Sequence, residues 1–242
     1  MSSNSSNLLQ SVIDVYGGQK YWESVQSLNV DFEFSGPALE VKGHPGPHKV
    51  QVIVDTKTKK VTFKQFGGYY GSWTPTRTEV GKIGSHDALD VRENPKEPFN
   101  THTGDSKWDI HNLFWFVGYA FWNYFNFPFN IADSEIQTRE VGGLTHENGE
   151  EWRSLEAVFS DGYPTHTKVQ KFDFDDGYRL RRMHYSVDVM KNGVPVWHNC
   201  YNHAVAGNLI YPTLRVVSVS APGMSFYSPF VLRGIKIEVN QS

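Results

Sequence analysis

Charged and polar residues that could transfer protons alternate with mostly apolar ones in "RLRRMHYSVDVM", residues 179–190. Successive side chains of a β-strand point to opposite faces, so Arg182 and His184 share one face, which continues to Asp188. His166 lies on the preceding predicted strand. A histidine held by a carboxylate or phenol can act as an acid or base near neutral pH, and an arginine can stabilise an oxyanion. If this face lines a cavity, His184, His166 and Arg182 are catalytic candidates; otherwise it is the solvated side of a half-buried antiparallel sheet.

The densest aromatic stretch, "HNLFWFVGYAFWNYFNFPFN", covers residues 111–130. A membrane-spanning helix needs about 20 mainly apolar residues, whereas the apolar part of this stretch, Leu113 to Phe129, is shorter and is interrupted by Asn123 and Asn126. On a helix, His111, Trp115, Tyr119 and Trp122 form one stripe, and phenylalanines form a second. A helix that is aromatic on both sides is buried. We therefore predict a buried helix whose His/Trp/Tyr stripe contacts a hydrophobic ligand; an ordinary core helix is the alternative.

Two further residues, Tyr185 and His198, join the substrate-binding candidates. His198 precedes Cys200 in "HNCYNH", where a cysteine nucleophile is conceivable, although a buried free cysteine is commonly an apolar filler. The ten histidines include no HxH pair, and "DFDDG" lacks the later ligands of a calcium loop. The sequence predicts no metal site.

Composition excludes several classes of protein. The net charge of −3 leaves no basic surface of the kind that nucleic acids require. There is no nucleotide-binding, P-loop, GxSxG or HExxH motif, so we expect no cofactor. A single cysteine precludes an internal disulfide and fits a reducing compartment. The first residues resemble no export signal, and we predict a cytoplasmic protein without an integral membrane segment.

The elements that must position these residues are mostly strands. Residues 1–6 are predicted to be disordered, and 7–242 to form one domain. Helical spacing covers 8–16 and a short helix is expected over 19–27, after which the apolar period changes from 3.6 to 2. About ten or eleven antiparallel strands follow, joined by turns such as "DDGY", "KNGV" and "ENGE", with the aromatic helix between them. The paired glycines of "GGYYGSW" suggest a bulge or turn.

Several of these segments carry a family resemblance. The N-terminal "YGGQKYWESVQSL", leading into long alternating strands, resembles the lipoprotein-localisation (LolA/LolB-like) superfamily. Within it, "GYAFWNYFNFPF", "THTKVQKFDFDDGYRLRRMHYSVDV" and "YPTLRVV" are similar to a group of uncharacterised bacterial and fungal proteins, over roughly residues 108–217. The resemblance implies a strongly curved antiparallel half-barrel around helices that plug its concave face. It also implies a cavity for lipophilic ligands.

We therefore expect a mainly β fold, a curved antiparallel half-barrel sheet that encloses a central aromatic helix, with short N-terminal helices. Two functions fit it, and the sequence favours the first, because a plain lipid pocket does not require an Arg–His–Asp face. One is a cofactor-independent enzyme that acts on a hydrophobic small molecule, by cyclisation or isomerisation in a preorganised pocket. The other is a non-catalytic carrier or sensor of a lipophilic ligand. An enzyme predicts that the Arg and His candidates converge on the aromatic wall, whereas a carrier predicts that they face solvent.

Overall fold

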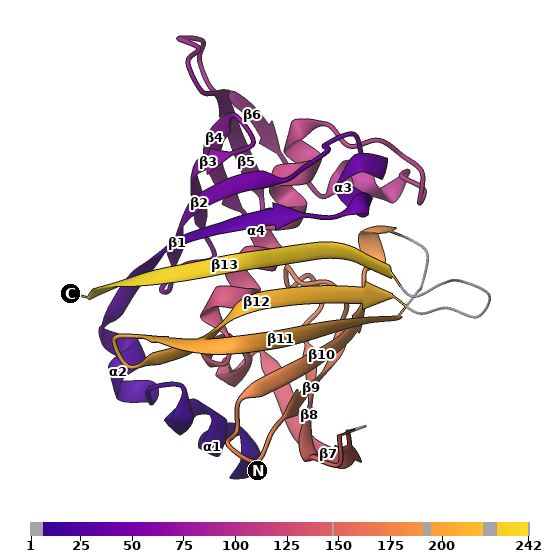
Figure 1. The fold of residues 1–242 in the computed structure, drawn as a ribbon. Coiled ribbons are helices and arrows are strands. Elements are labelled where there is room, and N and C mark those ends of the chain that lie inside the picture. Colours follow the sequence, from indigo (N-terminus) through magenta and orange to yellow (C-terminus); the bar gives the residue numbers. More distant parts are fainter. Residues whose placement is uncertain (1–6, 147, 191–194, 220–226, 242) are drawn as a thin grey trace.

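The thirteen strands of the described residues form one antiparallel sheet that curves without closing (Figure 1). The computed structural model describes residues 7–146, 148–190, 195–219 and 227–241. The predicted disordered segment 1–6 and the "KNGV" turn lie outside these residues. The strand order is β6-β5-β4-β3-β2-β1-β13-β12-β11-β10-β9-β8-β7. The mainly β half-barrel with a central aromatic helix and short N-terminal helices is confirmed.

The elements have the following bounds. The helices are α1 Asn7–Val15, α2 Gln19–Ser24, α3 Pro37–Val41 and α4 Ile110–Asn126, with 3-10 helices at Glu97–Asn100, Phe129–Ala132 and Asp188–Met190. The first strands are β1 Val25–Ser35, β2 His48–Asp55, β3 Val61–Phe66, β4 Tyr69–Thr74, β5 Arg77–Lys82 and β6 Asp90–Glu93. The later strands are β7 Ile136–Thr145, β8 Glu151–Phe159, β9 Val169–Phe174, β10 Leu180–Ser186, β11 Pro195–Ala206, β12 Leu209–Val219 and β13 Tyr227–Gln241.

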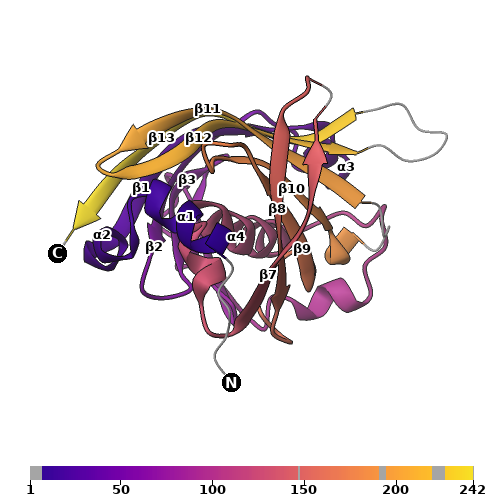
Figure 2. The same ribbon diagram turned by 90° about the horizontal axis from the view of Figure 1, so that it is seen from below.

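The topology explains why α4 is enclosed. The first and last strands, β1 and β13, pair in the middle of the sheet, which leaves β6 and β7 as its two edges. The segment that joins these edges contains α4, so the helix must cross from one side of the sheet to the other. It crosses on the concave side of the curved sheet, as the view from below shows (Figure 2).

Local sequence fixes the ends of α4. Asp109 caps its first turn, accepting a hydrogen bond from the backbone of Asn112, whose side chain bonds back to Asp109. The helix stops at Asn126 because Phe127 precedes a proline, which disfavours helical backbone at that residue. Nearly every residue of α4 is buried. Of the helices that the structure describes, none is long and apolar enough to cross a membrane.

The sequence pattern misses one strand and misplaces two boundaries. His166 was predicted to lie on a strand, but β9 begins only at Val169. β4 follows Gly67 and Gly68, which take positive φ angles of 55° and 93° in a tight turn after β3, so the glycines mark the turn and not the strand beyond it. α2 also ends at Ser24, earlier than predicted, and Val25 already pairs with Gln241. Tertiary strand pairing outweighs local helical spacing there.

Candidate functional site

A chain of buried phenol and imidazole groups lies between α4 and the sheet. The Tyr119 hydroxyl is 3.1 Å from Nδ1 of His166, and the Tyr124 hydroxyl is 2.6 Å from Nε2 of the same ring. Tyr124 is also hydrogen-bonded to the Tyr185 hydroxyl at 3.1 Å. The Tyr185 hydroxyl in turn lies 3.1 Å from Nδ1 of His198. Five side chains thus share one continuous hydrogen-bonded network.

Four segments of the chain hold this network in place. Tyr119 and Tyr124 come from α4, whereas Tyr185 and His198 come from the inner faces of β10 and β11. His166 lies in the connection between β8 and β9, and its ring stacks on Tyr185 with centroids 4.4 Å apart. The Nδ2 atom of Asn123 donates to the carbonyl oxygen of Pro164 at 2.7 Å, which ties that connection to the helix.

Burial keeps these groups neutral. Desolvation lowers the pKa of His166 to about 3. It also holds the pKa of His198 well below its usual value, aided by the positive charge of Arg215 and by His166. Desolvation raises the pKa values of Tyr119, Tyr124 and Tyr185. Each group therefore offers hydrogen bonds instead of charge at neutral pH.

Arg215 on β12 is buried beside this network. Its Nη2 atom donates to the carbonyl oxygen of Tyr124 at 3.1 Å, and its guanidinium lies over the Tyr124 ring at 5.1 Å. Nη1 faces the sulfur atoms of Cys200 at 3.4 Å and Met183 at 3.8 Å. The Nε atom has no hydrogen-bond partner among the described residues.

Three neighbouring cavities follow the inner faces of β12 and β13. The room inside them is small, about 120 Å³ in the first and about 20 Å³ in each of the other two. We name them the α3-side, central and α2-side cavities. The first two share Val187, Val217 and Phe230, and the last two share Tyr124. The α3-side cavity also contacts Val41, Met190, Val196, Val219 and Pro229; the central one Phe116, Ala120, Phe121, His166, Tyr185 and Leu232; the α2-side one Tyr16, Trp22, Phe125, Leu209, Tyr211 and Arg215.

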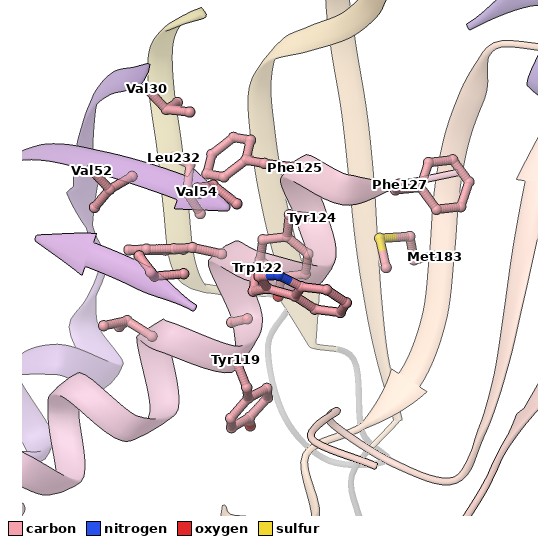
Figure 3. Close-up of a cluster of buried hydrophobic side chains, with 14 of the residues drawn as sticks. Val30, Val52, Val54, Tyr119, Trp122, Tyr124, Phe125, Phe127, Met183 and Leu232 are labelled. Carbon is pink, nitrogen blue, oxygen red and sulfur yellow. The ribbon is translucent and has the colours of Figure 1, made fainter. Parts of the chain in front are cut away.

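Figure 3 shows how the end of α4 divides this space. Phe125 projects toward the strands that carry Val54 and Leu232, whereas Phe127 projects toward Met183 on β10. Tyr124 lies between these two directions, which places it at the junction of the central and α2-side cavities.

The structure does not bring the three catalytic candidates together. Arg182 lies on the outer face of β10, where its Nε donates to Oδ1 of Asn199 at 2.8 Å and its guanidinium stacks over Trp197 at 4.9 Å. His184 is on the same outer face and is hydrogen-bonded to the buried carboxylate of Asp173. Only His166 reaches the interior. The proposed catalytic role of these residues stays a prediction, but a shared cluster is not what the geometry provides.

The predicted aromatic stripe is also dispersed. His111 is bonded through Nδ1 to the Thr78 hydroxyl at 2.8 Å, near the start of α4. Trp115 packs on Phe99, with centroids 5.2 Å apart. The indole of Trp122 donates to two carbonyl oxygens of the β2–β3 turn and faces a separate surface hollow. Of the stripe, only Tyr119 joins the network, whereas the candidates Tyr185 and His198 both belong to it.

Sequence reasoning missed Tyr124 and Arg215. Tyr124 follows Val117, Ala120 and Phe121 at helical spacing, and that apolar stripe passes for ordinary core. Arg215 did leave a signal: in "TLRVVSVS" it shares a strand face with Val217 and Val219, both of them buried. A charged residue on an apolar face is the kind of exception that marks a functional position. Within the described parts of the chain, no three His, Cys, Asp or Glu residues cluster as a metal site would require.

The comparisons with known proteins bear on the fold. No protein-family model and no curated protein sequence matches this chain. Among solved structures, a LolA superfamily protein from Nitrosomonas europaea aligns with a TM-score of 0.53 and 12% identity, covering 100% of this chain and 95% of that one. A DUF1329 family protein from Desulfovibrio piger aligns with a TM-score of 0.53 and 10% identity, covering 98% and 96%. The resemblance drawn from the sequence is confirmed at the level of architecture: this chain has the LolA-like half-barrel fold.

Proposed function

We propose that this protein binds and carries a lipophilic small molecule in the space between α4 and strands β12 and β13. The observation that carries the proposal is the run of three neighbouring cavities, whose lining is mainly aliphatic and aromatic and includes polar groups of Lys42, His166 and Arg215. Apolar walls with a few convergent polar groups are typical of binding sites for lipophilic ligands. The hydroxyl and imidazole groups of the network would orient such a ligand, and the cavity for greasy ligands that the family resemblance implies supports the same function.

The central and α2-side cavities are narrow, so a ligand would have to widen them. The sheet is open, because its two edge strands β6 and β7 are not bonded to each other, so the cavities can widen without breaking strand pairing. Burial of apolar ligand surface contributes roughly 25 cal/mol per Å² to offset that rearrangement.

The enzymatic alternative, a cofactor-independent cyclase or isomerase, is favoured by one observation: His166 and Tyr185 contact the central cavity. Efficient acid–base catalysis needs a group whose pKa lies near the working pH. Burial moves the pKa of His166 down to about 3 and that of Tyr185 up, away from neutrality in both cases. The carrier function is therefore our main proposal, and we keep the cytoplasmic location as a prediction of the sequence.

A neutral fluorescent probe, N-phenylnaphthylamine, tests the carrier proposal. The wild type should bind it with an increase in fluorescence. Val217→Phe fills the central cavity and should weaken binding roughly tenfold or more, because a filled cavity must overpack to admit the probe. Val205→Phe makes the same change at a position that is 64% exposed and should bind like the wild type.

A second substitution tests the same cavity in case the Val217→Phe variant does not fold. Phe116→Ala enlarges the central cavity and should maintain or increase the affinity. If the wild type binds no probe, or if Val217→Phe and Val205→Phe bind it equally well, the proposed site is wrong. Conversion of an extracted native ligand by the wild type, but not by His166→Gln, would establish the enzymatic alternative.

A further inference from the structure

Arg215 is a buried cation without an anionic partner among the described residues. Its side chain is 2% exposed, and none of the ion pairs of the described residues includes it. Its neighbours are two sulfur atoms, a backbone carbonyl and an aromatic ring, and its Nε is unpaired. Moving an unpaired charge out of water is costly, and buried charges in proteins are normally paired. This position therefore lacks a counter-charge.

A second unsatisfied atom lies close by. His198 Nδ1 is bonded to Tyr185, while its Nε2 is buried and has no partner among the described residues. His198 on β11 pairs with Val217 on β12, which makes Arg215 its diagonal neighbour across the two strands. Diagonal neighbours on one face lie about 7–8 Å apart, within reach of long side chains. Two unmet hydrogen-bonding atoms thus lie close together: Arg215 lines the α2-side cavity, and His198 packs behind Tyr124 and Tyr185, which line the central one.

We propose that Arg215 and His198 bind the carboxylate of an amphiphilic ligand whose apolar chain occupies the central and α3-side cavities. This inference rests on the carrier function and specifies its ligand class. A single guanidinium matches one negative charge, and its planar fork suits a carboxylate. His198 in the tautomer with a proton on Nε2 adds one neutral donor.

The strand geometry gives the apolar chain its path. Val217 and Val219 follow Arg215 at alternate positions on the inner face of β12, so the wall that extends from the guanidinium is aliphatic. From Arg215 to Val219 the strand rises about 13 Å. Phe230 on β13 contacts both the central and α3-side cavities along this path.

Matched ligands test the inference without any mutation. Isothermal titration at pH 8, below micelle-forming concentrations, should show that the wild type binds dodecanoate roughly 10- to 100-fold more tightly than dodecanol, the ratio expected for a hydrogen-bonded charge pair. Arg215→Gln should remove this preference by weakening dodecanoate binding far more than dodecanol binding. Arg215→Lys should restore part of it. Arg139→Gln removes the same charge at a side chain that is 71% exposed and should bind both ligands like the wild type.

Each other outcome has a defined meaning. Equal affinities for the acid and the alcohol in the wild type overturn the anion site and leave the carrier function standing. The same conclusion follows if Arg215→Gln weakens both ligands equally. Tighter binding of dodecyl phosphate than of dodecanoate overturns the carboxylate assignment. If neither the acid nor the alcohol binds, the carrier function itself fails.

Discussion

The buried charge of Arg215 makes a testable prediction about stability: Arg215→Met should stabilise the ligand-free protein. Leaving an unpaired ion out of water costs several kcal/mol even after the structure relaxes. Methionine fills much of the same volume with a flexible apolar chain. The substitution gives up the hydrogen bond to the Tyr124 carbonyl and the contact with its ring. These are worth about 1.5–3 and 0.5–2 kcal/mol.

The balance is a gain of roughly 1–2 kcal/mol in the free energy of unfolding. For a chain of 242 residues, such a gain corresponds to a rise of about 2–8 °C in Tm. Urea titration followed by tryptophan fluorescence, on protein stripped of bound lipid, measures it directly. Arg139→Met is the matched control at an exposed side chain and should leave the stability nearly unchanged.

A loss of more than about 1 kcal/mol in ligand-free Arg215→Met would refute this reasoning, because it would mean that the guanidinium contacts stabilise the fold by more than its burial costs. A gain in stability together with loss of dodecanoate binding would mean that the chain retains a destabilising charge that serves its ligand. That combination is the expected result.

The remaining predictions concern single contacts. Burial lowers the pKa of His166 from 6.5 to about 3. The unfolded chain therefore binds a proton at this residue below pH 6.5, whereas the folded protein does so only near pH 3. The unfolding free energy is thus highest above pH 6.5 and falls as the pH drops toward 3. His166→Gln should therefore reduce the pH slope of the unfolding free energy in that window by about 1.4 kcal/mol per pH unit, measured by urea titration at several pH values. Gly118→Ala places a Cβ 2.2 Å from Cγ of Trp73 and should lower the unfolding free energy by roughly 1–3 kcal/mol in the same assay. Burial acts to raise the pKa of Asp173, but hydrogen bonds and charge from His184 and other neighbours hold it below its ordinary value of 3.8. Asp173→Asn should therefore cost about 1–3 kcal/mol at pH 7, and acid titration should show this difference shrinking progressively as the pH falls below 3.8.

Much of the architecture was predictable because the spacing of apolar residues along the chain differs between helices and strands. The buried helix, the alternating strands and the short N-terminal helices follow from apolar spacing and capping residues. The alternation in β10 was also correct for the residues after Arg181: Met183 and Tyr185 are buried, whereas Arg182 and His184 are on the other face. The single-domain division of residues 7–242 remains a prediction.

The direction of each face was harder to predict. Simple alternation groups Leu180 with Arg182, yet Leu180 is buried and Arg182 is not. A register shift between these two residues in the pairing with β9 breaks the alternation. Such an irregularity depends on the neighbouring strand, so the sequence of β10 alone could not reveal which face meets the cavity.

The cavity was similarly beyond local reasoning. Tyr124 and Arg215 are 91 positions apart in the chain, and they meet only because α4 crosses under β12. The predicted ligand-contacting stripe consists of His111, Trp115, Tyr119 and Trp122. Most of its polar side-chain atoms form hydrogen bonds to β2, to β5 or to the network and do not face a cavity. Helical spacing predicts that residues share a side, and only the tertiary arrangement decides what that side meets.

Native mass spectrometry with lipid extraction tests the central claim most directly. Wild-type protein, Val217→Phe and Val205→Phe should each be incubated with a lipid extract of the expression host and then analysed intact. We predict one bound apolar molecule on the wild type and on Val205→Phe, and little or none on Val217→Phe. Absence of any bound lipid on the wild type, or equal loading of all three proteins, would contradict the proposed cavity site.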